Sequence, residues 1–331
     1  MTSRLHRIAF SAIAAAIAGV WLAQAPAAAQ SQAAAAPAKP YTAPKTPWGH
    51  PDLMGTWTNW DRTPLEAPDP GAKTNDSGVN EDDAARPLYE YNGKKYEYAG
   101  LGSGMGREHQ SPVSAKRKSL VSDPDNGRLP LKVVPREPTD QELFDDYLNH
   151  SAWTRCISMG VPGRYLNPAG GGYNKAYEIF QSPGHVVLYH EMLHEARVIP
   201  LDGGAHVGAD VKMWMGDSKG HWEGQTLVIE TTNFNGKGDG QPRGVKQTQG
   251  LKTVERFTRV DEKTLKYEVT LADPNVYSRP WTAVQFHNLD PKYEIYEYAC
   301  HEGNVRYMET TLGRGRLLEA EGAPPQNKYS K

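Results

Sequence analysis

From Tyr173 onward the chain is a succession of short β-prone runs separated by turns, and this pattern restricts the possible folds more than any other feature. The runs alternate apolar and polar residues and are bounded by turn sequences such as Ser182-Pro183-Gly184 and Asp261-Glu262-Lys263-Thr264. Short, regularly spaced strands without helical patterns between them are typical of antiparallel barrels and sandwiches. We therefore predict an all-β fold with minor α content, a single-domain antiparallel β-barrel.

The predicted elements can be placed along the chain. Strands are expected at residues 51–58, 176–181, 186–191, 196–201, 211–215, 226–230, 253–259, 265–271, 281–287 and 293–300. A capping box at Thr139 and Glu142 predicts a helix that runs to about His150. Residues 304–320 are a second helix candidate, although they contain two glycines. Residues 216–220 are rich in turn formers and are expected to join two strands.

The first 29 residues resemble a secretory signal peptide. Arg4 and Arg7 form a basic start, residues 8–23 are apolar or small, and Ala27-Ala28-Ala29 offers a cleavage pattern. The apolar run is shorter than the roughly 20 residues that a membrane-spanning helix needs. We therefore expect cleavage after residue 29 and a periplasmic or secreted protein.

The remaining chain divides by composition. Residues 30–47 are rich in Ala, Pro, Lys and Gln and are expected to be a flexible leader. The barrel domain is predicted at residues 48–322, with a loop-rich region at 62–137 that is dominated by Pro, Gly, Asp and Asn. Residues 323–331 are a tail.

Charge and hydropathy argue against two classes of partner. Loss of Arg4 and Arg7 with the signal peptide shifts the formal net charge from −2 to about −4. A protein that binds nucleic acid usually carries excess positive charge, and this chain does not. No second apolar stretch is long enough to be an integral membrane segment, so the expected partner is a small molecule.

The only two cysteines are Cys156 and Cys300. In an oxidising compartment we expect a disulfide between them. Such a bridge would tie the middle of the chain to its predicted last strand.

His190-Glu191-Met192-Leu193-His194 matches the pattern H-E-x-x-H. On a helix, His190 and His194 would bind zinc and Glu191 would activate the metal-bound water. The β-branched residues on both sides favour strands instead, so we prefer a hairpin in which the motif lies across the turn. The helix, and with it zinc bound by the two histidines, stays open as an alternative; otherwise no metal or organic cofactor is expected.

Several polar residues are candidates for catalysis. If residues 191–197 are extended, Glu191, Glu195 and Arg197 share one face, and His194 lies nearby. A carboxylate beside a guanidinium and a histidine can transfer protons. Cys300-His301-Glu302 is expected at a strand end, with His301 facing away from Cys300. The candidate catalytic residues are Glu191, His194, Arg197, His301 and Glu302.

A second group of residues could bind a substrate. Ligand pockets are mostly apolar with a few polar groups, and aromatic residues are plentiful in these segments. The candidate binding residues are Tyr173, His206, Trp222, Glu223 and Asn304.

Two resemblances refine this interpretation. Gly55-x-Trp57 on the first strand resembles the opening of lipocalins, where a tryptophan closes the barrel floor; this implies a lipocalin- or calycin-like barrel.

The chain also resembles a large family of exported bacterial β-rich proteins of unassigned function. That likeness covers most of residues 47–320 and rests on PWGHPDL (47–53), EMLHEARVIPLDG (191–203), WMGDSKGHWEG (214–224), ERFTR (255–259) and ACHEGN (299–304). It implies an exported single-domain protein and supplies no reaction.

Together these observations predict an exported barrel that holds a small organic molecule. We favour a cofactor-independent acid–base enzyme, that is, a lyase, isomerase or hydrolase. The alternatives are a non-catalytic lipocalin-like binding protein and a zinc-dependent hydrolase.

Overall fold

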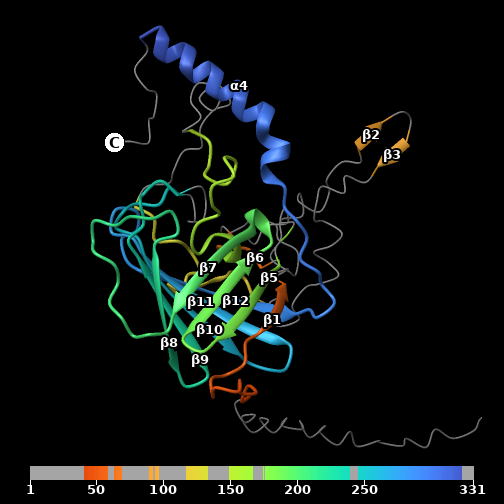
Figure 1. The fold of residues 1–331 in the computed structure, drawn as a ribbon, viewed down its shortest axis with the longest axis vertical. Coiled ribbons are helices and arrows are strands. Elements are labelled where there is room, and N and C mark those ends of the chain that lie inside the picture. The colour runs from red at the N-terminus through yellow and green to blue at the C-terminus, as the bar shows by residue number, and fades with distance from the viewer. Residues whose placement is uncertain are drawn as a thin grey trace, which may run out of the picture. The chain divides into compact units, whose positions relative to one another are not determined.

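The structure is a computed structural model, and it describes residues 41–58, 63–68, 89–91, 94–96, 117–132, 149–166, 174, 176–238 and 245–322. These residues belong to a unit that begins at Pro40. Their main element is an antiparallel sheet of ten strands that curls into a nearly closed barrel (Figure 1). The predicted all-β barrel with minor α content is therefore confirmed.

The barrel consists of two antiparallel runs of strands that its first strand joins into one sheet. Its strands are β1 (Gly55–Thr58), β4 (Val121–Asp123), β5 (Tyr177–Ser182), β6 (His185–His190), β7 (Glu195–Pro200), β8 (Asp217–Glu223), β9 (Thr226–Thr232), β10 (Lys252–Arg259), β11 (Thr264–Ala272) and β12 (Trp281–Leu289). They follow the order β7-β6-β5-β1-β12-β11-β10-β9-β8, and β4 pairs with β12. A separate two-stranded sheet contains β2 (Tyr89–Tyr91) and β3 (Lys94–Tyr96). β1 joins the two runs, β5 to β7 and β8 to β12, because it pairs with both β5 and β12.

The alternation of residues along each strand determines which side chains fill the barrel. In β11, Leu265, Tyr267, Val269 and Leu271 are buried, and the residues between them are partly exposed. The same period of two holds along β12 and β10, as expected for strands with one face on a core. Burial of these side chains supplies the main driving force for the fold. The inward set is not purely apolar, because it includes Glu255, Gln285 and His287.

β7 and β8 are the two ends of the sheet order, and side chains rather than backbone pairing join them. A guanidinium nitrogen of Arg197 on β7 donates to Ser218 Oγ on β8 at 3.3 Å. Further along, a Cβ placed on Gly220 would lie 2.7 Å from Leu201 Cδ2 and 2.9 Å from Ile199 Cγ2. Glycine at this position therefore lets the two strands approach closely enough to close the barrel.

Trp57 packs at the end of the barrel that the β10–β11 turn closes. Its ring is fully buried, and its Nε1 donates to the Leu53 carbonyl at 2.9 Å. The guanidinium of Arg259 lies 5.8 Å from the ring centroid and donates to the carbonyls of Asp52 and Glu262. A cation over an indole face is a favourable contact. The tryptophan of the Gly-x-Trp opening thus lies in the barrel core beneath an arginine.

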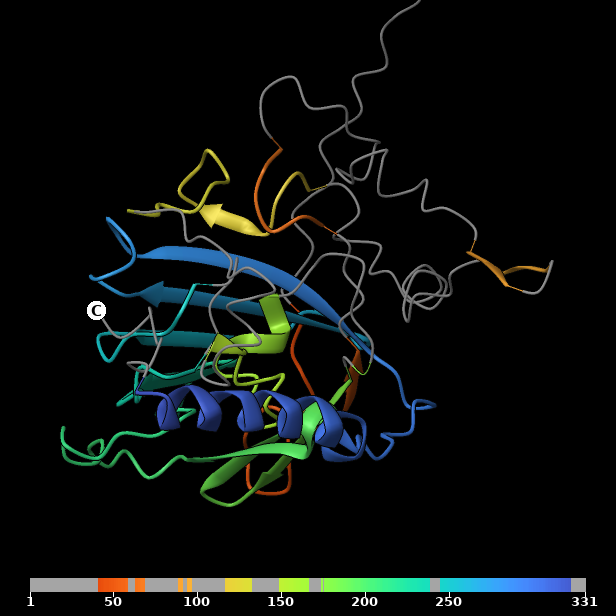
Figure 2. The same ribbon diagram turned by 90° about the horizontal axis from the view of Figure 1, so that it is seen from above.

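Residues 149–166, which we call the cover segment, lie over the other end. The 3₁₀ turn η3 (Gly163–Leu166), drawn in yellow-green beside the strands in Figure 2, carries Tyr165. The Tyr165 ring centroid is 4.5 Å from that of Tyr267 and 5.0 Å from that of Tyr177. Cys156 of the cover segment forms a disulfide with Cys300, which is the first residue of helix α4 (Cys300–Ala320). The predicted disulfide is therefore confirmed.

Most predicted strands are present, and three elements differ. Residues 216–220 were expected to be a turn but mostly belong to β8, and residues 211–215 form only an isolated bridge at Met213. Residues 293–299 form no strand and run without regular secondary structure into α4, which begins at Cys300. The helix predicted to end near His150 lies largely outside the described residues.

Candidate functional site

A cluster of polar side chains occupies the barrel interior towards the cover segment. Arg197 on β7 donates to both carboxylate oxygens of Glu255 on β10, at 3.2 and 2.6 Å, and Tyr267 donates to the same carboxylate at 3.0 Å. All three residues are buried. Bidentate pairing of this kind is strong and fixes the geometry of both groups.

The electrostatics of this cluster keep the ion pair charged. Burial alone would lower the pKa of Arg197, but the Glu255 carboxylate raises it above its ordinary value. Burial raises the pKa of Tyr267 well above its usual range, and the charge of Glu255 adds to this. The interior therefore holds one fixed ion pair and a tyrosine that keeps its proton.

Two further polar rings lie beside Tyr165. Tyr177 Oη and His287 Nδ1 are 2.6 Å apart, and both residues are fully buried. His287 Nε2 has no hydrogen-bond partner in the described structure. Burial, assisted by nearby His190, lowers the pKa of His287 to about 3, so the imidazole is neutral at physiological pH.

Glu195 is the carboxyl group that lies directly beneath the cover segment. It accepts hydrogen bonds from Ser158 Oγ and from the backbone N–H of Met159. Burial raises the pKa of Glu195, although these hydrogen bonds and the charge of Arg197 oppose the shift. Its position is set by β7, which turns Glu195, Arg197 and Ile199 inward by alternation.

Glu195 faces a small pocket. Its walls come from the cover segment and from the strand ends, and they comprise Met159, Gly160, Pro162, Tyr165, His190, Glu195, Arg197 and Met215. The enclosed space is close to what one water molecule needs. A larger ligand could enter only if the cover segment moved.

The H-E-x-x-H residues do not form the helical zinc motif. His190 ends β6, Glu191 lies in the connection, and the 3₁₀ turn η4 (Met192–His194) leads into β7. Leu193 and His194 adopt left-handed backbone angles, with φ of 63° and 51°. The preferred hairpin is therefore confirmed. Within the described ranges, no group of three or more His, Cys, Asp or Glu side chains is arranged to hold a metal ion.

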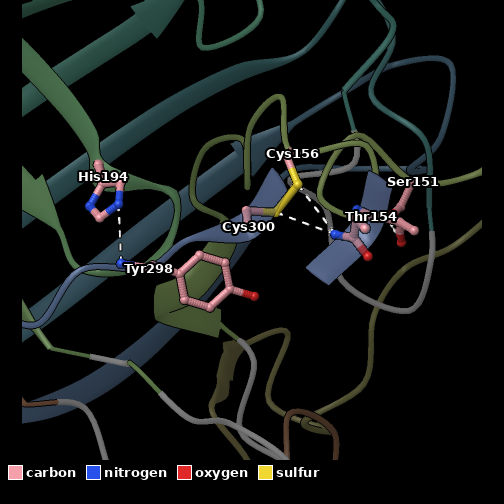
Figure 3. Close-up of a disulfide and its surroundings, with 7 residues drawn as sticks. Ser151, Thr154, Cys156, His194, Tyr298 and Cys300 are labelled. Carbon is pink, nitrogen blue, oxygen red and sulfur yellow. Dashed lines mark hydrogen bonds between the residues drawn. A yellow bond between two sulfur atoms is a disulfide. The ribbon is translucent and has the colours of Figure 1, made fainter. Parts of the chain in front are cut away.

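The other predicted catalytic residues are dispersed. Glu191 is buried and accepts from Asn174 Nδ2 and Tyr293 Oη, so it does not share the face of Glu195 and Arg197. His194 is exposed, and its Nε2 accepts the Tyr298 backbone N–H at 3.1 Å (Figure 3). His301 and Glu302 are exposed in the first turn of α4 rather than at a strand end.

Asn304 is tied to the disulfide. Asn304 lies one turn after Cys300 in α4, and its Nδ2 is 3.3 Å from Cys156 Sγ and 3.5 Å from Cys300 Sγ. We find it near the covalent link between the cover segment and the helix, and not among the residues that line the pocket.

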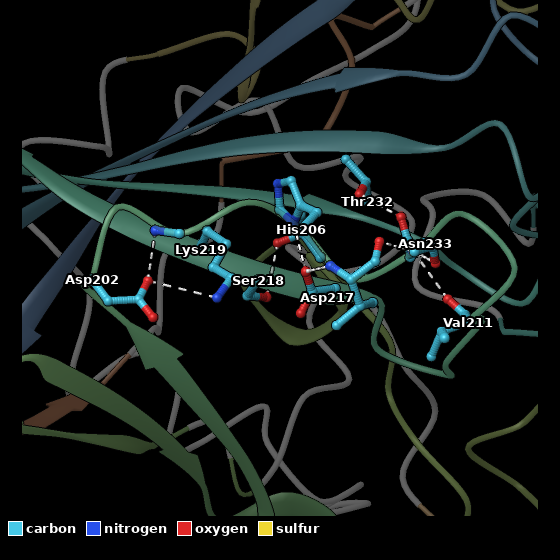
Figure 4. A network of polar contacts seen from close by, with 12 residues as sticks. Asp202, His206, Val211, Asp217, Ser218, Lys219, Thr232 and Asn233 are labelled. Atoms are coloured by element: carbon cyan, nitrogen blue, oxygen red, sulfur yellow. Dashed lines mark hydrogen bonds and ion pairs between the residues drawn. The ribbon is translucent and has the colours of Figure 1, made fainter.

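The predicted binding residues are likewise outside the pocket. His206 Nδ1 and Asp217 Oδ2 are 2.7 Å apart on the barrel exterior (Figure 4). Trp222 packs on the ring of His50, and Glu223 binds Arg256, whose hydrogen bond lowers the pKa of the carboxyl group. Tyr173 lies outside the described residues.

Sequence reasoning missed Glu255, Tyr165 and His287. Glu255 could have been found, because it alternates with Thr253 and Phe257 on the predicted inward face of one strand. His287 follows the same rule on β12. Tyr165 lies in a non-repetitive turn, and its sequence carries no comparable signal.

Comparisons with known protein families, with curated proteins and with solved structures found no match for this chain. Among the described residues, no helix combines the length and apolar character needed to cross a membrane.

Proposed function

We propose that this protein is an exported enzyme that transfers protons on a small organic substrate, without an organic cofactor. The observation that carries the proposal is the position of Glu195. It is a buried carboxyl group with a raised pKa that forms no direct ion pair with another described residue, and it lies on the wall of a pocket that also contains Arg197. Buried acids with shifted pKa values are typical of catalytic sites.

Each group in the pocket has a separate role in this proposal. Glu195 gives and takes the proton, since a carboxyl group with a raised pKa can hold one nearer to neutral pH. Arg197 faces the same space and stabilises negative charge that develops on a substrate oxygen. Glu255 and Tyr267 hold the guanidinium in place and are positioning residues.

The polar character of the pocket favours an enzyme over a carrier. A carrier for apolar ligands needs a large dry cavity, whereas here Phe257, Tyr267 and other rings fill the interior. A non-catalytic lipocalin-like binding protein remains the second candidate, supported by Trp57 under Arg259 at the closed end. The H-E-x-x-H segment is a hairpin and not a helix, so its histidines lack the spacing on one helix face that a zinc hydrolase needs.

Proton transfer can be tested before the substrate is known. The purified protein is incubated in D₂O with a panel of small ketones, keto acids and hydroxy acids, and exchange of their C–H protons is followed by NMR. We expect exchange of at least one compound. We also expect Glu195→Gln to slow that exchange by about 100-fold or more, which is the usual contribution of a positioned acid or base.

The matched control is Glu262→Gln, an exposed glutamate in the β10–β11 turn. It should exchange protons at the wild-type rate. If Glu195→Gln also kept the wild-type rate, the assignment of Glu195 would be wrong. If a compound bound tightly and none exchanged, the carrier would replace the enzyme.

A further inference from the structure

A second hollow lies on the outside of the barrel, away from the pocket under the cover segment. It is formed by outward residues of β1, β5 and β6, by His194 of η4 and by residues 293–297, and its volume is about 590 Å³. This is within the range of small-molecule sites, roughly 300–1,000 Å³. Alternation separates the two sites: on β6, Tyr189 lines the hollow while His190 lines the internal pocket.

The hollow is acidic. Glu178, Glu294 and Glu297 are among its walls, and the described residues that line it include no lysine or arginine. None of the three carboxylates forms an ion pair with another described residue, so their charges are not locally neutralised. The walls therefore produce a negative potential that favours a cation.

The hollow is also aromatic. Tyr189, Tyr293 and Tyr296 line it, and Tyr296 is 63 % exposed although it is a large ring. The ring centroids of Tyr293 and Tyr296 are 6.5 Å apart at an interplanar angle of 74°. Tyr293 is held by its hydrogen bond to Glu191 Oε2, at 2.7 Å. The face of an exposed tyrosine ring attracts positive charge.

The carboxylates and aromatic rings of the hollow together favour an organic cation over a metal ion. Chelation of a metal needs several carboxylate or imidazole groups around one point, and the described residues contain no such group of three. Spread carboxylates beside aromatic faces fit a bulky cation with diffuse charge. We propose that this hollow binds a small organic ammonium compound, with Tyr293 and Tyr296 against its methyl or methylene groups and the glutamates supplying the countercharge.

The proposal is tested by calorimetric titration of the full-length protein with choline and with 3,3-dimethyl-1-butanol. The two probes have nearly the same shape, and only choline is charged. We expect choline to bind at least tenfold more tightly than the neutral probe, and to weaken as salt is raised. Equal affinity for both probes, or binding of neither, would overturn the proposal.

Variants identify the site. Tyr296→Leu removes the exposed aromatic face and should weaken choline binding about tenfold, whereas Tyr296→Phe keeps the face and should retain it. The double variant Glu294→Gln, Glu297→Gln should bind choline about fivefold more weakly, and the distant Glu262→Gln should bind choline with wild-type affinity. Thermal melting of each variant checks folding. Unchanged binding in Tyr296→Leu would place the cation elsewhere.

The experiment is independent of the proton-transfer proposal. Tyr296→Leu should leave the NMR exchange rate unchanged, and Glu195→Gln should leave choline binding unchanged, because the two sites share no lining residue and lie on opposite faces of β6. Failure of one proposal is thereby distinguished from failure of the other.

Discussion

His287 shows how a single residue can make the stability of the barrel depend on pH. It is fully buried between Tyr177 and Tyr165, and its pKa of about 3 means that the folded protein holds it neutral. In the unfolded chain the same imidazole has an ordinary pKa near 6.5. Below pH 6.5 the His287 imidazole therefore binds a proton in the unfolded state but not in the folded state.

We expect the free energy of unfolding to fall by about 1.4 kcal/mol per pH unit below pH 6.5 on account of His287, until the pH nears 3. Glu195 acts in the opposite direction, because its pKa is raised in the folded state. Comparison with His287→Gln isolates the histidine. Urea unfolding followed by tryptophan fluorescence at pH 7, 6 and 5 should give a steeper loss for wild type than for this variant.

The exposed His185 supplies the control. His185→Gln should follow the wild-type pH dependence, since this substitution leaves the buried His287 in place. If the free energy of unfolding fell equally with pH in wild type and in His287→Gln, His287 would not be the cause of the pH dependence, and the prediction would be wrong.

At the scale of elements, local sequence predicted the β6–β7 and β10–β11 hairpins correctly, but it also predicted a strand at residues 293–300 that does not form, and it placed strand ends poorly. β10 and β11 alternate over their whole length around a turn of polar residues, so their pairing follows from local sequence alone. The run Gly216–Gly220 has turn chemistry, yet β8 forms there because it pairs along its full length with β9. Pairing with the next strand in a hairpin overrode the turn propensity of these residues.

The candidate site was harder to predict from the sequence, because it is built from residues that lie far apart along the chain. Arg197 was predicted as a functional residue, but its partner Glu255 is 58 positions away and on another strand. A turn from the cover segment brings in Tyr165, and no local pattern could place that ring inside the barrel. Inward positions were predictable from alternation, and the contacts made there were not.

The β7–β8 junction offers a test at this scale. Gly220→Val should lower the free energy of unfolding by about 1–3 kcal/mol, because the added atoms meet Leu201 and Ile199 at less than 3 Å. Gly208→Val is the matched control, since a Cβ there has no neighbour within 4 Å. Urea denaturation of both variants measures the difference. Equal stabilities would mean that the two strands can separate freely.

At the scale of the whole molecule, the disulfide connects parts that the sheet does not. It joins the cover segment to α4 across 144 positions of sequence. In the chain-entropy model a loop of this length stabilises the folded state by about 5 kcal/mol, and measured values are often lower.

We expect Cys156→Ser with Cys300→Ser to lower the free energy of unfolding by about 3–5 kcal/mol, measured by urea denaturation. Treatment of wild type with dithiothreitol is the control and should produce the same loss. A loss below about 1 kcal/mol would show that other contacts hold the cover segment and the helix in place.

The junction between β7 and β8 has a consequence for the protein in concentrated solution. Every other neighbouring pair in the sheet order is held by a ladder of backbone hydrogen bonds, whereas these two strands turn their unpaired edges towards each other. An uncovered strand edge can add a strand from another molecule. The contact between Gly220 and the side chains of β7 therefore shields the two edges of the sheet from self-association, and loosening it should favour aggregation before the rest of the barrel unfolds.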